Sequence, residues 1–387
     1  KNNNKKKKRA GPDGELYDDS VSTYRIFSRA FCNFVFPRPI GRPMPGNEAI
    51  KMATEEFSDG MKKIIEDVAK NKLDEDELDA ATTDERIANV DGRYTEDDRK
   101  DLDSSKKSLQ DRYQQNILKA MSELKDNDEF YLTPDGKEGS GGLAIYSPKF
   151  LNILENIVDP EHVGLHLIYS QFRTIEGVGV LKLVLEANGF VQFKLKKGSN
   201  GQWEINIKDE DKGKPSFALY TGTEDQEEKE LVRNIFNGTW EYVPNNIVTE
   251  LNKISSNNLM GEVIKVFMIT ASGAEGISLR NTRYVHVVEP YWHPVRMEQV
   301  IGRARRICSH EDLPAELRTV DVFLYLMTFS EEQLTSDESI ELRLKDKGKL
   351  TERPLTSDEA LHEISNIKSD INGNLLNAIK ESAMDCS

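Results

Sequence analysis

The chain has 387 residues, of which 37% are hydrophobic and 31% are charged, and its formal net charge is −15. This length holds one large or two to three ordinary domains with a packed core, which excludes a small fold held together by disulfides. The three cysteines, Cys32, Cys308 and Cys386, lie far apart without paired spacing. We therefore expect no disulfide framework, no metal site and a reducing compartment.

The sequence contains no apolar run near the ~18 residues that cross a membrane, and no signal series opens it. We expect a soluble intracellular protein without a membrane partner. Its charge is distributed unevenly, because residues 74–103 hold 13 acidic and 4 basic residues, whereas residues 280–310 hold six arginines, two glutamates and three histidines. The basic stretch keeps a polyanionic partner possible in spite of the negative total.

The chain opens with KNNNKKKKRA, a polar tract that lacks Met. A solvated linker is the favoured interpretation, and a nuclear address or a nucleic-acid tether is the alternative. Residues 24–46, YRIFSRAFCNFVFPRPIGRPMPG, are rich in aromatic residues and arginine and end in prolines that prevent helix continuation. We predict that residues 1–46 connect the rest of the protein to a neighbouring N-terminal domain outside this chain.

Residues 47–130 are predicted to form a helical and acidic region between domains, part of it a solvated or disordered insert at residues 73–106. Helical spacing returns at residues 107–126, and the Gly-rich loop TPDGKEGSGG follows.

From residue 146 to residue 330 the pattern alternates between strands and helices, which predicts an α/β fold with a parallel sheet covered by helices on both faces. The helix at 223–238 has Thr223 as its expected N-cap and Gly238 after its end. Residues 331–387 are predicted to be a C-terminal helical extension. The other expected elements are strands at 165–172, 190–195, 215–222, 265–270, 283–290 and 320–329, and a helix from residue 294 to about residue 307.

The segment QVIGRARR carries the most specific motif. Gln299, Gly302, Arg303 and Arg306 fit the Q-x-x-G-R-x-x-R pattern of motif VI in superfamily 2 helicases. On a helix, Gln299, Arg303 and Arg306 are four and three residues apart and share one face. Two guanidiniums on one face must meet anions or remain in water.

Three further segments extend the resemblance in the expected order. The turn TASGAEG (270–276) resembles motif V, with glycines that let the backbone approach a phosphate. IYSQF (168–172) is similar to motif IV of Swi/Snf-type ATPases, and ALYTGT, followed by Arg233, resembles motif IVa. EPYWHP (289–294) lies where Swi/Snf-type ATPases carry an acidic residue, Pro, Trp and Pro, although His293 departs from their usual Asn.

The chain thus resembles the second, C-terminal RecA-like domain of superfamily 2 helicases and Swi/Snf-type ATPases over residues 146–329. Its flanks look like those of helicase-like ATPases of large nucleocytoplasmic DNA viruses, including relatives of the poxvirus transcription ATPases. The resemblance implies an ATP-dependent nucleic-acid helicase or translocase whose ATP and Mg²⁺ are held mainly by the N-terminal lobe. A virion, or the host cytoplasm or nucleus, would be its location.

The resemblance also implies a role for each motif residue. Arg303 and Arg306 would act as arginine fingers on the γ-phosphate of ATP. Gln299, Gly302, Glu275 and Gly276 would bind the nucleotide. The expected contacts to the backbone of DNA or RNA are Ser170, Gln171, Thr221, Gly222, Thr223, Thr270 and Ser272.

No G-x-x-x-x-G-K-[ST] phosphate-binding loop is present, because DGKEGSGG (135–142) lacks the spacing, and the DEDE at 74–77 does not follow an apolar strand. We therefore expect this chain alone not to hydrolyse ATP. The alternative function is a non-catalytic RecA-like module that docks to RNA polymerase or other transcription or replication machinery.

Several residues also have simpler interpretations. EGVGV (176–180) lacks a third glycine and is expected to be a turn or helix start and not a dinucleotide loop. His286, His293, Cys308 and His310 match no zinc spacing and are expected to pack or cap. Trp292 is expected to wedge the sheet edge, with base stacking as the alternative. Cys32 is predicted to be a small buried residue.

Overall fold

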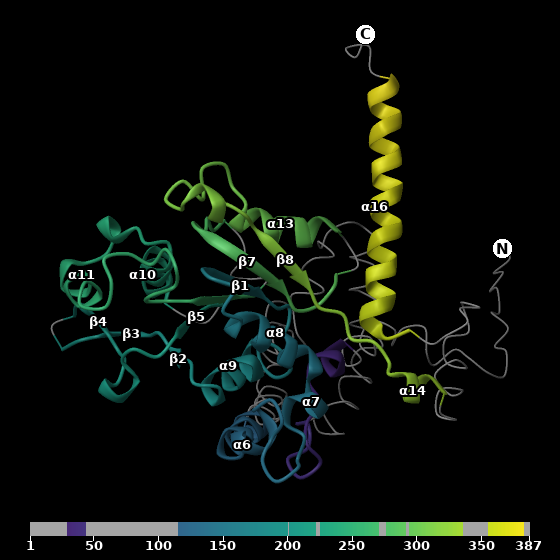
Figure 1. Ribbon diagram of the computed structural model, residues 1–387, viewed down its shortest axis with the longest axis horizontal. Coiled ribbons are helices and arrows are strands. Elements are labelled where there is room, and N and C mark those ends of the chain that lie inside the picture. Colours follow the sequence, from purple (N-terminus) through teal and green to yellow (C-terminus); the bar gives the residue numbers. More distant parts are fainter. Residues whose placement is uncertain are drawn as a thin grey trace, which may run out of the picture.

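A computed structural model describes residues 29–43, 115–199, 201–221, 225–270, 276–291, 294–335 and 355–382 of the chain. Its centre is one parallel sheet with helices on both faces (Figure 1). The α/β, RecA-like fold class predicted from the sequence is therefore confirmed.

The sheet has six strands, and every described pairing in it is parallel. In spatial order they are β2 (Val191–Gln192), β5 (Ser216–Tyr220), β6 (Val266–Ile269), β1 (Leu165–Tyr169), β7 (Thr282–Val287) and β8 (Asp321–Leu324). The central strands β1, β6 and β7 are buried at every residue. Burial of every residue suits a sheet that is covered on both sides, which is the usual setting of parallel strands.

The helices come before, between and after these strands in the chain. They are α6 (Asp128–Tyr131), α7 (Gly142–Tyr146), α8 (Pro148–Val158), α9 (Val178–Ala187), α10 (Gln226–Phe236), α11 (Asn245–Leu251), α13 (Pro294–Ala304), α14 (Glu331–Thr335) and α16 (Ser357–Ser382), with short 3-10 turns η1 (Asp209–Asp211), η2 (Trp240–Tyr242) and η3 (Ala315–Leu317). The sheet separates two apolar cores, because successive strand residues point to opposite faces. Leu167 of β1 packs with α10, α11 and α13 on one face, and Ile168 packs with α8 and α9 on the other.

The segment FVQFKL, expected as one strand, belongs to two sheets. Val191 and Gln192 pair with β5 at the edge of the main sheet, whereas Leu195 pairs with Ile205 in an antiparallel hairpin of β3 (Leu195–Lys197) and β4 (Trp203–Ile205). The chain leaves the main sheet after Phe193, whose N–H donates to the carbonyl of Phe217 (2.8 Å). The single-strand prediction is therefore wrong, because the apolar alternation continues across the point where the strand changes partners.

Two helix ends differ from the sequence prediction. The N-cap of α10 is Asp225, whose carboxylate accepts the N–H of Glu227 (2.9 Å). The expected N-cap, Thr223, lies outside the described residues. Helix α13 ends at Ala304 and not near residue 307, because the Ala304 carbonyl accepts the hydroxyl of Ser309 (3.0 Å) instead of a helical N–H.

The segment 29–43 packs onto the α8 face of the sheet. Phe34 is fully buried, and its ring lies 6.4 Å from that of Phe150 on α8. The helical residues 115–126 join the same core through Ala120 and Leu124. These segments share a core with the α/β domain, and the four predicted domain boundaries, after residues 46, 130, 145 and 330, remain predictions.

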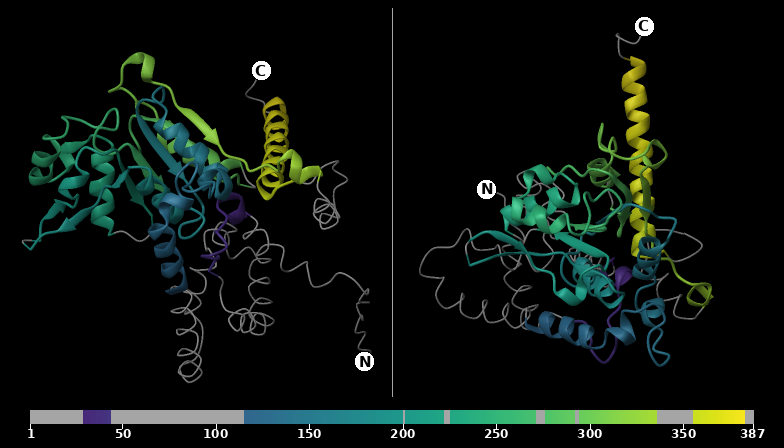
Figure 2. Two further views of the ribbon diagram at one scale, coloured as in Figure 1. Left: turned by 60° about the horizontal axis from the view of Figure 1, so that its bottom comes forward. Right: turned by 60° about the vertical axis from the view of Figure 1, so that its left-hand side comes forward.

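Helix α16 extends away from the body of the molecule, and only its first turns lie against it (Figures 1 and 2). Asp358, Leu361 and Ser365 are buried, whereas from Ile367 onward the apolar side chains are exposed. Within the described residues, no helix is both long enough and apolar enough to cross a membrane.

Candidate functional site

Three predicted nucleic-acid contacts each follow a strand directly. Ser170 follows β1, Thr221 follows β5 and Thr270 follows β6. Tyr169 and Tyr220, the last residues of β1 and β5, both pair with Ile269, the last residue of β6. Ser170, Thr221 and Thr270, which follow them, therefore lie in one row along the carboxyl edge of the sheet. This edge is where open α/β sheets bind their ligands.

Glu289, the acidic residue of EPYWHP, organises one end of this row. It is fully buried, and its Oε1 accepts the hydroxyl of Ser170 (2.6 Å) and the Nδ2 amide of Asn33 (2.5 Å). Its Oε2 accepts the backbone N–H of Gln171 (2.9 Å). The Ser170 hydroxyl therefore points inward to Glu289, and the contribution of Ser170 to the edge is to fix the start of the following loop.

Burial raises the pKa of the Glu289 carboxyl, and four neighbours lower it again: Lys149, Ser170, the N–H of Gln171 and Arg29. A buried carboxylate is tolerated only where donors and cations replace its hydration. The Glu289 carboxylate and the donors and cations around it therefore form one cluster, because removal of any of these partners leaves the buried charge less well compensated.

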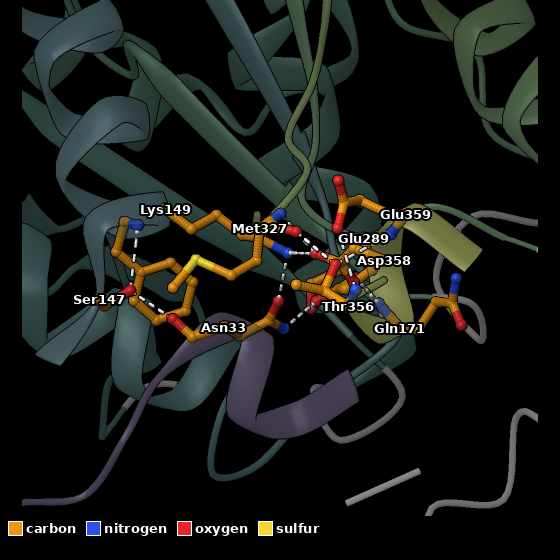
Figure 3. Close-up of polar contacts among 11 residues, drawn as sticks. Asn33, Ser147, Lys149, Gln171, Glu289, Met327, Thr356, Asp358 and Glu359 are labelled. Carbon is orange, nitrogen blue, oxygen red and sulfur yellow. Dashed lines mark hydrogen bonds and ion pairs between the residues drawn. The ribbon is translucent and has the colours of Figure 1, made fainter. Parts of the chain in front are cut away.

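A buried ion pair continues this cluster toward α16. The ammonium of Lys149 lies 2.5 Å from the carboxylate of Asp358 and donates to Oδ1 of Asn33 (2.9 Å). Asp358 also accepts the backbone N–H of Met327 (3.0 Å), and Ser147 donates to the carbonyl of Asn33. Figure 3 shows side chains from segment 29–43, α8 and α16 converging on one point beside Glu289.

Asn33, Lys149 and Asp358 were not identified from the sequence. Each is a polar residue in a stretch of otherwise ordinary composition, and their partners lie 116 or 209 residues away. The one available signal was a lysine between aromatic residues in YSPKF, which is unusual for a surface position.

Gln171 is the next residue along the edge and is half-buried. Its side-chain carbonyl accepts a hydrogen bond from the guanidinium of Arg29. Among the described residues, no partner is found for its buried Nε2. Gln171 is thus held in place by Arg29 on one side while it retains donor capacity.

The motif VI residues form a second group. Gln299 and Arg303 lie four residues apart on α13, so the prediction that they share a helix face is confirmed, and Gln299 is exposed. Arg306 follows the end of α13 and does not share that face through helical spacing. The correction follows from the early helix end, because Leu279 donates its N–H to the Arg303 carbonyl (3.1 Å).

The side chains of the two arginines are held differently. Arg306 is exposed, and its Nη2 donates to the carbonyl of Ile277 (3.0 Å), directly after the motif V turn. Arg303 is half-buried, and for its buried Nε no acceptor exists within the described part of the chain. The Arg306 guanidinium is therefore hydrogen-bonded to the residue after motif V, whereas Arg303 has one N–H donor without an acceptor among the described residues.

The two glycines predicted to bind nucleotide both lie in open surroundings. Gly276 is exposed with φ +72°, and a Cβ at Gly276 or at Gly302 would meet nothing within 4 Å. The remaining predicted site residues lie outside the described residues: Gly222, Thr223, Ser272 and Glu275.

The EGVGV glycines have a packing role at the start of α9. A Cβ at Gly179 would lie 1.6 Å from the carbonyl oxygen of Thr174, and one at Gly177 would lie 1.8 Å from that of Phe172. The predicted helix start is confirmed, because α9 begins at Val178. The loop that carries Gln171 therefore lies tightly against this helix end.

Two of the residues considered for a metal site, His286 and His310, make internal contacts. His286 is fully buried and contacts His166 (3.0 Å) and the hydroxyl of Tyr325 (2.8 Å), and His310 contacts the carbonyl of Thr282 (2.8 Å). Cys308 is exposed, and His293 and Trp292 lie outside the described residues. Cys32 is buried as predicted, and burial together with the nearby Asp358 raises its pKa to about 11.

No protein-family model matches the chain. A protein of Acanthamoeba polyphaga mimivirus, named as an ATP-dependent RNA helicase, is 29% identical over 390 residues, which cover 94% of this chain and 39% of that protein. A termination factor NPH-I homolog of African swine fever virus is 30% identical over 263 residues, which cover 62% of this chain and 33% of the homolog. The chain is related to the helicase-type ATPases of large DNA viruses.

A helicase of invertebrate iridescent virus 3 adds a third viral relative, at 25% identity over 62% of this chain and 20% of that protein. The chain spans well under half the length of these relatives. Among solved structures, the C-terminal part of the Fun30 ATPase domain covers 58% of this chain and 55% of its own at 14% identity and a TM-score of 0.29, which is too low to establish a common fold.

Proposed function

We propose that this chain is the C-terminal motor lobe of an ATP-dependent nucleic-acid helicase or translocase. An N-terminal RecA-like lobe of the same polypeptide would hold most of the ATP and its Mg²⁺, and DNA or RNA would bind along the carboxyl edge of the sheet. The observation that carries the proposal is the pair Arg303 and Arg306, held beside the motif V turn with hydrogen-bonding capacity left over.

The two arginines fit the developing charge of a transferring phosphoryl group. A guanidinium has five N–H donors, so the bond from Arg306 to the Ile277 carbonyl orients the group while other donors can reach a phosphate. Arg303, with its unpartnered Nε, would supply the second guanidinium. Preorganised cations of this kind stabilise the transition state more than the ground state.

The glycine at 302 also fits a nucleotide at this surface. A glycine inside a helix costs about 0.5 to 1 kcal/mol relative to alanine. Packing within the described chain gives no reason for it, because a Cβ there would meet nothing within 4 Å. Close approach of a phosphate or ribose would give one, with Gln299 on the same face of α13, and Glu275 and Gly276 would complete the nucleotide contacts.

The row of strand-end residues supports the nucleic-acid role. Gln171 is half-buried and Thr221 and Thr270 are buried along one edge, and Gly222, Thr223 and Ser272 follow these strands in the sequence. Ser170 would act through the loop that it holds to Glu289. Backbone contacts of this kind fix the position of the strand without reading its sequence.

The names of the viral relatives support the same class of function. They include ATP-dependent RNA helicases and a termination factor homolog. Transcription machinery is therefore the partner we assign to the full-length protein.

Arginine substitutions in the full-length polypeptide test the proposal. Arg306→Ala and Arg303→Ala are each expected to lower nucleic-acid-stimulated ATP turnover by about 10³-fold or more, the usual worth of an arginine finger. Arg305→Ala is the matched control, because Arg305 is exposed at the same helix end and has no assigned role. Turnover that survives both test substitutions would refute the assignment, and a wild-type protein without ATPase activity would favour the docking module.

A further inference from the structure

A second candidate binding site lies at the edge of the sheet, away from the motif VI arginines. It is a cavity of about 410 Å³ at β2, and its apolar floor includes Phe193, Leu195 and Leu219. This volume is within the range of ordinary small-ligand sites. The edge strand β2 and the β3–β4 hairpin lie side by side here (Figure 1).

Three lysines from three different elements surround this cavity. Lys182 comes from α9 on one face of the sheet, Lys229 from α10 on the other face, and Lys194 from the edge between them. One carboxylate, that of Glu228, also lines the cavity. A surplus of positive charge at one place in a chain of net charge −15 points to an anionic ligand.

The charge of Lys182 is incompletely compensated. Burial lowers the pKa of its ammonium, the carboxylate of Glu186 raises it from 3.7 Å away, and Lys194 and Lys125 lower it further. A bound anion would relieve this repulsion.

One lining residue, Lys229, contacts the carboxyl edge described above. The ammonium of Lys229 donates to the carbonyl of Thr221 (3.3 Å) and lies 5.3 Å from the centre of the Tyr220 ring. Thr221 is the outermost residue of the row of proposed backbone contacts, since β5 is the last strand before β2. A nucleic-acid strand that leaves Thr221 in this direction arrives at the lysines.

One polar group in the lining lacks a partner. The buried Oε1 atom of Gln192 is an acceptor for which the described residues provide no donor. An apolar floor, an amide acceptor and a rim of cations match the three parts of a nucleotide: the base, its amino or imino group, and the phosphate.

We propose that this pocket binds one nucleotide unit, with its phosphate between Lys182, Lys194 and Lys229 and its base against the Phe193–Leu195 floor. The nucleotide belongs to the strand held at the carboxyl edge, so the proposal rests on the proposed nucleic-acid function and extends it beyond Thr221. It assigns a role to the edge of the sheet that no helicase motif covers.

Fluorescence anisotropy with a labelled single-stranded oligonucleotide, at a series of salt concentrations, tests the pocket. The double variant Lys182→Gln/Lys194→Gln is expected to bind at least tenfold more weakly and to lower the slope of log affinity against log salt by about 0.7, the value for one phosphate contact on a single strand. The matched control is Lys119→Gln/Lys253→Gln, which removes the same charge from two exposed lysines elsewhere.

Two further ligands, an abasic strand and adenosine monophosphate, distinguish a nucleotide within a strand from a free nucleotide. An abasic strand of the same length is expected to bind wild type more weakly than the normal strand, and the pocket variant is expected to bind both strands equally. A third outcome is that wild type binds adenosine monophosphate but no oligonucleotide, and that the pocket variant binds neither. This result would support a nucleotide site and contradict the assignment of the nucleotide to a nucleic-acid strand.

Equal affinity and equal salt slope in the pocket and control variants overturn the pocket and leave the motor proposal intact. Absence of binding of either ligand to wild type overturns both the pocket and the nucleic-acid function. Thermal unfolding of each variant confirms that these surface substitutions leave the fold unchanged.

Discussion

His166 and His286 stack on each other inside the sheet, and neither can take up a proton there without cost. Their rings lie 5.3 Å apart between centroids, and both residues are fully buried. Burial lowers the pKa of each imidazole, that of His286 to about 3. Since His286 contacts His166 through one nitrogen and Tyr325 through the other, a neutral ring satisfies both neighbours.

This pair makes the stability of the protein depend on pH. The folded-state pKa lies below the unfolded value of about 6.5, so the unfolded chain binds more protons in acid. The contribution is complete above pH 6.5 and is lost as pH falls toward 3. From pH 6.5 to pH 5, His286 alone is expected to lower the free energy of unfolding by about 2 kcal/mol.

Urea unfolding at pH 7 and pH 5 measures this loss. His286→Gln, which cannot titrate, is expected to be less stable at both values and to decline less between them. His362→Gln on α16 is the control and should decline as wild type does. A His286→Gln variant with the full wild-type decline would remove this pair as the cause.

At the scale of elements, the start of α9 packs against the loop that carries Gln171 and so fixes the position of this loop at the carboxyl edge of the sheet. Gly177 and Gly179 allow this contact because any side chain there would collide with backbone carbonyls. The N–H of Val178 donates to the carbonyl of Phe172 (2.9 Å), which fastens the loop to the helix. The geometry of the edge therefore depends on two residues that do not touch a ligand.

Gly179→Ala is expected to lower the free energy of unfolding by about 1 to 3 kcal/mol, because the loop or the helix must move to accept the methyl group. Gly302→Ala is the matched control, a helical glycine with open space around its Cβ position. It is expected to raise stability by about 0.5 to 1 kcal/mol. Urea unfolding compares the two, and equal effects would show that the close approach at Gly179 is not limiting.

The six-stranded order of the sheet could be anticipated only in part. The short apolar runs LHLIY and VFMI, separated by helical stretches, predicted parallel strands correctly. The hairpin of β3 and β4 was missed because alternation of apolar residues is the same on both sides of Phe193. The end of α13 was missed because the last carbonyl groups of this helix, those of Arg303 and Ala304, accept hydrogen bonds from Leu279 and Ser309, which lie outside the helix.

At the scale of the whole molecule, one buried ion pair joins three parts of the chain. Lys149 on α8, Asp358 at the base of α16 and Asn33 of segment 29–43 meet beside Glu289. The outer part of α16 contributes little to this junction, because the side chains of Ile367, Ile371 and Leu375 are exposed. We therefore expect the first turns of α16 to contribute to the stability of the fold and the part from Ile367 onward to contribute little.

Asp358→Ala is expected to lower the free energy of unfolding by about 3 to 5 kcal/mol, because it leaves the ammonium of Lys149 buried without its carboxylate. Deletion of residues 367–387 is expected to leave the melting temperature within a few degrees of wild type. Both are measured by thermal unfolding. Lys149→Met/Asp358→Leu is the control that removes the unpaired ammonium, and it should recover part of the stability, since Glu289 and Asn33 still lose the contact with Lys149. A deletion as damaging as Asp358→Ala would contradict this division.

The sequence by itself determined the fold class and the order of the motifs. Helix and strand periodicity is local, and QVIGRARR and the strand-end Ser and Thr residues carry their chemistry in adjacent positions. Tertiary structure decided which polar groups face inward. Ser170 was predicted to contact nucleic acid, and its hydroxyl is bonded to Glu289, 119 residues away. Pairings over such distances depend on how the sheet brings strand ends together, which no local pattern encodes.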